Sequence, residues 1–543
     1  MKTCIRWAVL LGVVAMLSLA LPATAQDDTY FPGAEWRTST PEEQGMDSAK
    51  LLEALQYIED EALPIDSLTV IRNGYVVLDA YYYPYTADMK HHFASATRGF
   101  TATLLGIAMD QGLITSLDQP IRELLPNAAL PLELNPAVGV TVGELLAWSS
   151  GFYCDWLNIE PDALASDYPA VARFELIAAQ GRRNLENGQV FDNGCTFDSD
   201  LLMGVLSDVT VDAVPQFAEN QLFASIGIQD YTWMADKRDV PFGAAGLWLT
   251  PYDMAKLGYL YLHRGQWEDN DVVSESWIDF VTCVDPESCL FEQPMGAANV
   301  SYPIHVGFGH HWFLVDFGTY VSWDLTGQML LVNPDRDIVG VITSPGIDWD
   351  PAQQKIAYGV FLDRILGSVA SDEALPVDDE AYGALSAEVA ILANPVPGAP
   401  APLPEIASAI SGHMYDFKRP LHAHFWLAER DLYSGQPLDI ASFSITFDEE
   451  DTAVLTLTYA DGSEMSIPIG LDGVWRTVET EFGMKAARGA WYEGPVSFRF
   501  ELRTVGNDDR QLFNMRFDGE RAFVGWVHAA TLTTQQVQAS MRE

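Results

Sequence analysis

The chain has 543 residues, of which 76 are Asp or Glu and 30 are Lys or Arg, so its formal net charge is −46. This length exceeds that of one ordinary domain, and a hydrophobic content of 48% excludes intrinsic disorder. The acid excess argues against nucleic acid or an anionic membrane as a partner, because like charges repel. We interpret the acidic residues as a solvated surface, and we note that only 8 of the 30 cationic residues are lysine.

The first residues have the pattern of a secretory signal peptide. Lys2 and Arg6 precede an apolar run over residues 7–21, and small residues follow at 23–25. The run is shorter than the ~20 residues that a membrane-spanning helix needs, so we predict cleavage after Ala25 rather than an anchor. No later stretch is long and apolar enough to span a membrane. We therefore expect a secreted or periplasmic protein without a membrane span in its mature chain.

Four cysteines remain after that cleavage, namely Cys154, Cys195, Cys283 and Cys289. An even number of cysteines in an exported chain favours disulfides. Cys283 and Cys289 are six residues apart, which suits a small closed loop and leaves Cys154 with Cys195. All three pairings are formally possible, and free thiols are the alternative.

The next elements in chain order are a hairpin and a buried helix. Residues 67–82 form two β-type runs around Asn73-Gly74, which predicts a tight turn. Residues 100–108 are apolar on nearly all sides and are followed by Gly112, which predicts a buried helix with a glycine stop.

The rest of the chain predicts a linker and a second, β-rich domain. Five prolines between 394 and 404 indicate a stiff connection. Beyond Ser411 apolar and polar residues alternate, and Asp461-Gly462 and Asp518-Gly519 are typical of hairpin turns. We predict a signal peptide at 1–25, a first domain at 26–372, a linker at 373–404 and an antiparallel β domain at 405–543.

The stretch with the clearest chemistry is 91–100, His-His-Phe-Ala-Ser-Ala-Thr-Arg-Gly-Phe, which leads into the buried helix. Ser95 lies at the start of that helix, where the positive end of the helix dipole favours developing negative charge. Arg98 follows three residues later on the same helical face. Serine acyltransferases of the S-x-x-K type have a lysine at this second position, whose neutral amine takes the serine proton. A lone serine before a helix is also the ordinary N-cap residue, so the spacing needs its context.

Other standard signatures are absent from the sequence. It has no H-E-x-x-H, no paired C-x-x-C, no P-loop and no G-x-S-x-G motif. His422 and His424 would share one face of a strand, but two histidines alone rarely hold a metal ion. We predict no metal site and no cofactor.

Several short sequence segments occur in the order that is typical of one family. They are residues 41–46, 95–112, 116–120, 140–151, 246–255 and 327–334. Over roughly residues 35–370 the chain resembles the β-lactamase-related serine hydrolases, which include class C β-lactamases, D-alanyl-D-alanine carboxypeptidases, esterases and amide hydrolases. The resemblance implies an α/β (α+β) fold with an antiparallel sheet flanked by helices and a helical subdomain. The C-terminal part resembles the barrel-like, lipocalin-like appendage of some members.

The chain departs from each catalytic motif of the family. Arg98 replaces the lysine, and an arginine side chain stays protonated. At the Y-x-N segment, near Asp192, Asn193 or Gly194 falls where the tyrosine is expected. The third motif reads Leu325-Thr326-Gly327, without its lysine or histidine.

The resemblance further implies an oxyanion hole formed by the backbone N–H groups of Ser95 and Gln328, which side-chain replacement does not remove. It also places Cys154 and Cys195 on segments that border the site, so we expect a disulfide between them.

Three functions follow from this pattern. The first is a serine hydrolase homologue that is weak or inactive as an acyl hydrolase, with Arg98 paired to Asp192 or Asp324 or to a ligand carboxylate. The second is an active esterase or amidase with a histidine as substituted base, for which the candidates are His91, His92, His310 and His311. The third is a pseudoenzyme that binds a peptide or a cell-wall fragment. In each case the expected partner is a small ester, amide or peptide.

Overall fold

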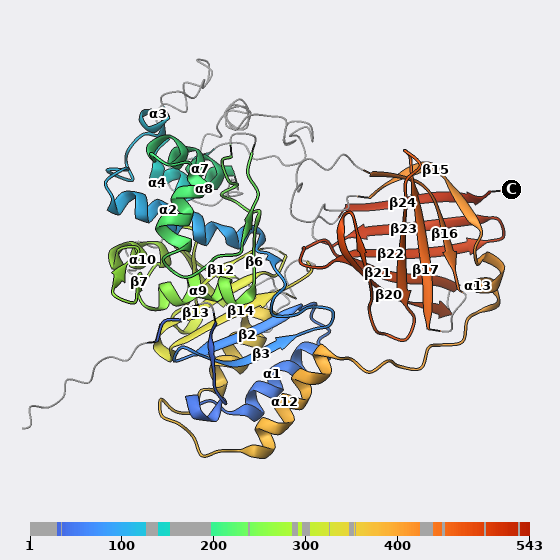
Figure 1. Cartoon of the computed structure of the whole chain (residues 1–543), viewed down its shortest axis with the longest axis horizontal. Helices are drawn as coiled ribbons and strands as arrows, with labels where there is room; N and C mark the ends of the chain where they lie inside the picture. The colour runs from blue at the N-terminus through green and yellow to red at the C-terminus, as the bar shows by residue number, and fades with distance from the viewer. Residues whose placement is uncertain are drawn as a thin grey trace, which may run out of the picture.

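The computed structural model describes residues 30–125, 140–151, 197–284, 291–295, 304–346, 352, 355–423, 438–447, 451–493, 496–529 and 533–542, apart from 34, 237, 238 and 325. Its first part is built on one nine-stranded sheet (Figure 1). In spatial order the strands are β1 (Arg37–Thr38), β3 (Tyr75–Tyr81), β2 (Ser67–Arg72), β14 (Ile338–Thr343), β13 (Met329–Asn333), β12 (Thr319–Trp323), β11 (Phe313–Val315), β10 (Ile304–Phe308) and β9 (Phe291–Met295). Among the described pairings of this sheet, only β1–β3 is parallel.

The predicted hairpin and the predicted buried helix are both present. Arg72 of β2 pairs with Tyr75 of β3, and Asn73 and Gly74 have φ values of 51° and 74°. Two central residues with positive φ match the type I′ turn that Asn-Gly favours. Helix α2 (Arg98–Asp110) is buried from Arg98 through Ala108, and Gly112 follows it with φ 70°.

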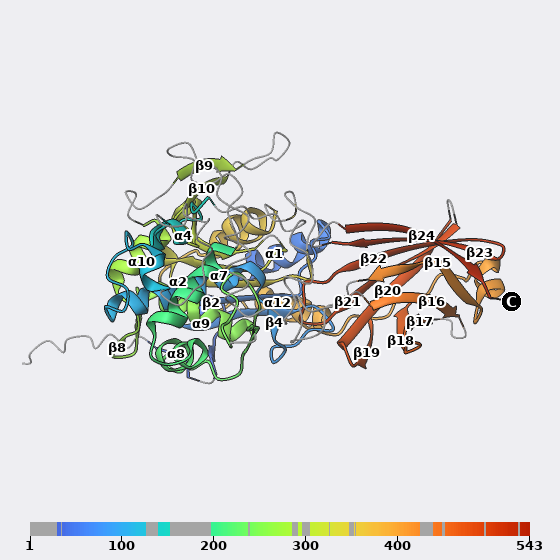
Figure 2. The same cartoon turned by 90° about the horizontal axis from the view of Figure 1, so that it is seen from above.

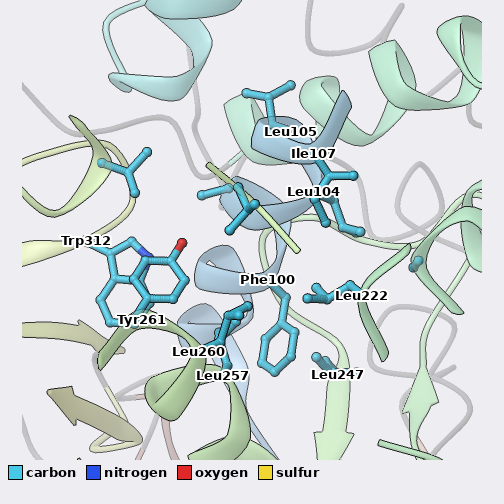
Figure 3. Packing of buried hydrophobic residues seen from close by; sticks show 14 of the residues in the cluster. Phe100, Leu104, Leu105, Ile107, Leu222, Leu247, Leu257, Leu260, Tyr261 and Trp312 are labelled. Atoms are coloured by element: carbon cyan, nitrogen blue, oxygen red, sulfur yellow. The ribbon is translucent and has the colours of Figure 1, made fainter. Parts of the chain in front are cut away.

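Helices cover both faces of this sheet, which explains why its central strands are buried on both sides. On one face, α1 (Ser48–Asp60), α12 (Asp379–Ala393) and the π-helix η8 (Lys355–Ile365) form a hydrophobic cluster with β14 residues such as Ile338 and Ile342. On the other face, α2 and α9 (Pro251–Leu262) pack with Val339 and Val341. Figure 3 shows Phe100 of α2 among Leu222, Leu247 and Leu257 on this second face.

Shorter elements complete the α2 side of the domain. The helices are α3 (Ile121–Leu124), α4 (Val142–Leu146), α7 (Phe197–Val209), α8 (Val214–Ala218), the π-helix η4 (Glu219–Phe223) and α10 (Glu275–Thr282). A small sheet joins β4 (His91–His92), β6 (Leu247–Leu249) and β5 (Thr232–Trp233), and β7 (Gln266–Trp267) pairs with β8 (Asn270–Asp271). Among the described residues no single helix has the length and hydropathy of a membrane span, and only the bent pair 198–209 and 214–223, at 90°, meets those limits together.

Part of the segment predicted as a linker is helical. Helix α12 occupies 379–393 within the predicted linker 373–404, and its Leu385 and Leu392 are buried with α1 in the core of the first domain. Asp378 caps the helix by accepting the N–H of Ala381 at 2.9 Å. The prolines that suggested a linker lie beyond this helix, and within 373–404 the residues 373–378 and 394–404 run without a helix or strand.

The C-terminal strands close into a barrel. After α13 (Glu405–Ile410) come β15 (Met414–Ala423), β16 (Leu438–Thr446), β17 (Thr452–Tyr459), β18 (Glu464–Gly470), β19 (Arg476–Thr480), β20 (Gly483–Glu493), β21 (Val496–Thr504), β22 (Gln511–Asp518), β23 (Arg521–His528) and β24 (Thr533–Met541). Nine strands form the ring, which the parallel β18–β20 contact at Gly470 and Arg488 closes, and β19 adds to the β20 edge.

The alternating pattern seen in the sequence fills the barrel interior. Phe498, Phe500 and Leu502 on β21 point into the barrel core, as the period of two predicts. Figure 2 shows that β21 lies at the side of the barrel that faces the first domain. The loop between β21 and β22, residues 505–510, reaches that domain through hydrogen bonds described below.

Candidate active site

Ser95 lies in a short 3-10 turn, Ala94–Thr97, that leads directly into α2. The preceding residues are held in the small sheet, since the Phe93 N–H donates to the Leu247 carbonyl at 2.7 Å. Ala94 has φ 43°, the left-handed region that an alanine rarely adopts. Ser95 is the one half-buried residue in the otherwise buried run 91–100. The fold therefore presents this serine, as the sequence predicted, at the start of a buried helix.

Arg98 contacts the Ser95 hydroxyl directly. Its Nη2 atom donates a hydrogen bond to Ser95 Oγ at 3.0 Å, and the side chain is 8% exposed. Its Cζ atom lies 4.5 Å from the ring centre of Trp148. A guanidinium stacked on an indole gains a cation–π interaction, which is stronger where water is excluded. Arg98 thus occupies the family lysine position as a fixed cation and a hydrogen-bond donor.

The third-motif segment forms the turn between β12 and β13 and lies near the nucleophile turn. Ser322 of β12 donates from its Oγ to the Ala96 carbonyl at 3.0 Å, which ties this strand to the Ser95 turn. Gly327 has φ 99°, so the turn uses a backbone conformation open to glycine. Ser95, Arg98, Thr326, Gly327 and Gln328 therefore belong to connected segments, whereas Leu325 lies outside the described residues.

Asp324 accepts a hydrogen bond from the Gln328 N–H, the group that we assigned to the oxyanion hole. The Gln328 N–H donates to Asp324 Oδ1 at 2.9 Å, and the Thr326 N–H donates to Oδ2 at 2.9 Å. Burial, and next the charge of Asp508, raise the pKa of Asp324 to about 6, although the N–H bonds from Thr326 and Gln328 act in the opposite direction. The oxyanion role of Gln328 stays a prediction, and in this conformation a carboxyl group already accepts from its N–H.

The four histidines proposed as bases differ in their surroundings. His91 stacks on Tyr85, with 5.0 Å between ring centres, and burial lowers its pKa to about 3. His92 is engaged at both nitrogens, because Nδ1 lies 2.9 Å from Asp508 Oδ1 and Nε2 accepts the Gly246 N–H at 3.2 Å. His92 therefore has no free nitrogen with which to take the serine proton.

The other two histidines follow Gly309 in the turn before β11. His310 stacks on Phe280 with 4.0 Å between ring centres, and burial lowers its pKa to about 4. His311 lies 5.4 Å from the Trp148 ring. Burial and then the Arg98 charge lower the pKa of His311 well below its usual value. Of the four, only His311 shares the Trp148 ring with Arg98.

Several predicted residues lie outside the described residues. They are Asp192, Asn193, Gly194, Cys154, Cys195 and Cys289. Cys283, at the end of α10, takes part in a disulfide, but its predicted pairing with Cys289 stays a prediction. Within the described residues no group of three His, Cys, Asp or Glu side chains is arranged to hold a metal ion.

Two residues that contact the site, Trp148 and Asp508, were not predicted from the sequence. Trp148 lies 50 residues from Arg98 in the sequence, and only its place beside Ser150-Gly151 pointed to this region. Asp508, in the β21–β22 loop, approaches His92 across 416 positions of sequence. Neither contact has a periodic or motif signature.

Comparison with known proteins agrees with this architecture. The family model described as Beta-lactamase matches residues 53–362. The chain is 22% identical over 316 residues to a 6-aminohexanoate-dimer hydrolase of Paenarthrobacter ureafaciens, covering 55% of this chain and 77% of that protein. The chain therefore belongs to the Beta-lactamase family of β-lactamase-related serine hydrolases.

Solved structures show similarity at low sequence identity. A family VIII carboxylesterase matches with a TM-score of 0.47 and 15% identity, over 60% of this chain and 99% of that one. The octameric penicillin-binding protein homologue from Pyrococcus abyssi matches with a TM-score of 0.41 and 15% identity, over 91% of this chain and all of that one (100%).

Proposed function

We propose that this protein is an exported β-lactamase-related serine hydrolase homologue whose Ser95 site is weak or inactive in acyl transfer. The observation that carries the proposal is the 3.0 Å hydrogen bond from Arg98 Nη2 to Ser95 Oγ. A guanidinium group keeps its protons at any physiological pH, so it cannot accept the proton that the serine must lose. Losing a positioned base typically costs ~10²–10⁴-fold in rate.

The Asp324 carboxyl group supports the same proposal. An acyl transfer reaction develops negative charge on the substrate oxygen, which needs N–H donors directed at it. Here the Gln328 N–H is directed at Asp324, a buried acid. Above a pH of about 6 this acid is ionised and would repel the developing oxyanion.

In this proposal the function of the Ser95 site is to bind a ligand. Arg98 is a cation held in place beside Ser95, and guanidinium groups bind carboxylates well. The relative is named as a hydrolase of a 6-aminohexanoate dimer, and a linear dimer of this amino acid is a small amide with a free carboxylate. We propose small peptides or cell-wall fragments with a free carboxylate as ligands. The N-terminal pattern at 1–25 supports export to the periplasm or the medium.

An active hydrolase with a histidine base is the second candidate, and His311 is the histidine that the structure favours. It is 2% exposed, and neither ring nitrogen has a hydrogen-bond partner among the described residues. Its depressed pKa keeps the ring neutral, which a base requires, but also makes it a poor proton acceptor.

Ester turnover separates the two candidates. Purified mature protein is compared with Ser95→Ala on p-nitrophenyl acetate and butyrate. The proposal predicts that the wild-type rate exceeds the rate of the variant by less than ~100-fold, because Ser95 has no positioned base. A wild-type rate that exceeds the variant by ~100-fold or more would establish an active hydrolase instead.

Ligand binding is tested by thermal shift with a matched pair of probes. The linear 6-aminohexanoate dimer and D-alanyl-D-alanine are each compared with their C-terminal amides. The proposal predicts stabilisation by the free acids only, and its loss in Arg98→Gln. Equal shifts for acid and amide would exclude Arg98 as the carboxylate contact.

A further inference from the structure

We propose that the barrel loop at residues 505–510 is a built-in part of the Ser95 site, with Asp508 as a positioning residue. Three consecutive residues of this loop bind β4, the strand that leads into Ser95, and β6, the strand that pairs with β4. The inference rests on the proposed location of the site at Ser95 and does not depend on whether that site is active.

The backbone of the loop packs directly on the chain before Ser95. The His92 N–H donates to the Gly506 carbonyl at 2.7 Å. Gly506 has φ 84°, and a Cβ atom there would lie 2.5 Å from the Lys90 carbonyl oxygen. Glycine is therefore required at 506 both by the conformation and by the close approach.

The side chains of the next two loop residues bind both strands of the small sheet. Trp248 Nε1 donates to Asn507 Oδ1 at 2.9 Å. His92 Nε2 accepts the Gly246 N–H, so Nδ1 carries a proton and donates to Asp508 Oδ1 at 2.9 Å. Asp508 thus fixes the tautomer and ring orientation of His92.

The small sheet transmits this contact to Ser95 by a short covalent path. His92 pairs with Trp248, and the Phe93 N–H bonds to the Leu247 carbonyl. Ser95 follows two residues later, after Ala94 in its unfavourable left-handed conformation. Such a conformation persists only where the surrounding structure determines it. The barrel loop supplies part of that surrounding structure.

The loop itself is anchored at both ends. At its start the Thr504 N–H donates to Asp509 at 2.6 Å, and Asp509 is buried with Lys485. At its end the Arg510 N–H donates to the Pro345 carbonyl of the first domain at 3.0 Å. Next to the loop, Arg503 Nη1 lies 3.0 Å from Asp66 Oδ1, and both side chains are buried. The loop is therefore held at both ends and connects the barrel to the Ser95 site.

The negative charge of Asp508 also acts on the site, because it raises the pKa of Asp324. Burial raises the pKa of Asp508, but the interaction with the His92 imidazole outweighs it, so the carboxyl group titrates below its usual range. His528 acts in the same direction. The resulting negative charge raises the pKa of Asp324, which also accepts hydrogen bonds from the N–H groups of Thr326 and Gln328 and from the Thr326 hydroxyl. The barrel thereby influences the ionisation of the acid at the predicted oxyanion position.

Four full-length variants separate the two connections, one of which, Asp508→Ala, removes both the acceptor for His92 and the charge. Asp508→Asn keeps an acceptor for His92 but removes the charge. Asn507→Ala removes the acceptor for Trp248 and keeps the charge of Asp508. Asp461→Asn, in the exposed β17–β18 turn, is the matched control.

Carboxyl NMR titration tests the charge connection. We expect Asp508→Asn to lower the pKa of Asp324 by about half a pH unit or more, and Asn507→Ala and Asp461→Asn to leave it unchanged. An Asp324 titration unchanged in Asp508→Asn would overturn this part of the proposal. The readout needs no acyl transfer, so its failure is distinct from a failure of the proposed function.

Hydrogen exchange by mass spectrometry tests the positioning connection. We expect peptides that cover 88–97 and 244–250 to exchange at least ~10-fold faster in Asn507→Ala and in Asp508→Ala, with the control unchanged. If Asp508→Ala does not fold, Asn507→Ala decides alone. Wild-type exchange around Ser95 in a folded variant would overturn the positioning role.

Discussion

The guanidinium carbon of Arg98 lies 4.5 Å from the ring centre of Trp148. This contact holds the cation beside Ser95, where its Nη2 atom donates to the serine hydroxyl. An arginine on a solvated face would be an ordinary exchange for lysine, but here the side chain is 8% exposed and stacked. The substitution therefore changes the chemistry of the site, because Arg98, which donates to the hydroxyl of the nucleophile, cannot take its proton.

Arg98→Lys restores a group that can lose its proton. Burial beside Trp148 favours the neutral amine of the introduced lysine, so it can act as base. We expect fluorophosphonate labelling of Ser95 to become at least ~10-fold faster than in the wild type. Arg521→Lys, at an exposed position of the barrel, is the matched control and should change nothing. Equal rates in Arg98→Lys and wild type would show that Arg98 does not limit the reaction.

His311→Ala tests the substituted base. The proposed function predicts that residual labelling of Ser95 is the same in wild type and His311→Ala, since a ring with so low a pKa removes the proton poorly. His310→Ala, which removes the neighbouring ring stacked on Phe280, serves as the comparison. A fall of ~10-fold or more in His311→Ala alone would establish the histidine as the base.

Local patterns predicted the local structure well. Asn73-Gly74 gave its hairpin, and the apolar run after Ser95 gave a buried helix with Arg98 one turn from the serine. The sequence segments that resemble the family predicted the fold of the first domain, and the match to the family model confirms this prediction. The period-two pattern beyond Ser411 led to a closed barrel.

Contacts between distant segments could not be predicted in this way. The bond between Asp324 and the Gln328 N–H depends on the shape of one turn, and a motif gives only residue types. The Asp508–His92 contact joins two domains through side chains that follow no period. Helix α12 was not predicted, because the prolines that follow it led us to interpret all of 373–404 as a linker. Asp378, just before the helix, is a favourable N-cap residue.

The buried pair of Arg503 and Asp66 should stabilise the junction between the barrel and the first domain. Arg503→Met leaves Asp66 buried without this cation, which should lower the free energy of unfolding by about 3–5 kcal/mol. Arg521→Met breaks an exposed pair with Asp518 and should cost about 0–1 kcal/mol. Urea denaturation of the full chain measures both changes. Similar small costs for the two variants would contradict the structural importance of the buried pair.

His91 should make the protein sensitive to acid. Its pKa is about 3 in the fold, below the value of about 6.5 in the unfolded chain, so only the unfolded state takes up a proton as the pH falls. Its contribution to stability is complete above a pH of about 6.5 and is lost below it, by about 2 kcal/mol at pH 5.

His91→Gln should therefore reduce the loss of unfolding free energy between pH 7 and pH 5 by about that amount. His413→Gln, at an exposed position, is the control and should follow the wild type. Parallel pH profiles for His91→Gln and wild type, measured by urea denaturation, would rule out this role for His91.

Covalent labelling of the mature wild-type protein is the most direct test of the central claim that the Ser95 site lacks a base. The protein is incubated with a fluorophosphonate probe at pH 7.5, and the modified residue is located by peptide mass spectrometry, with Ser95→Ala as control. We predict that Ser95 stays essentially unlabelled over hours, because Arg98 donates to its hydroxyl and cannot take its proton. Complete labelling of Ser95 within minutes, absent in Ser95→Ala, would contradict the account.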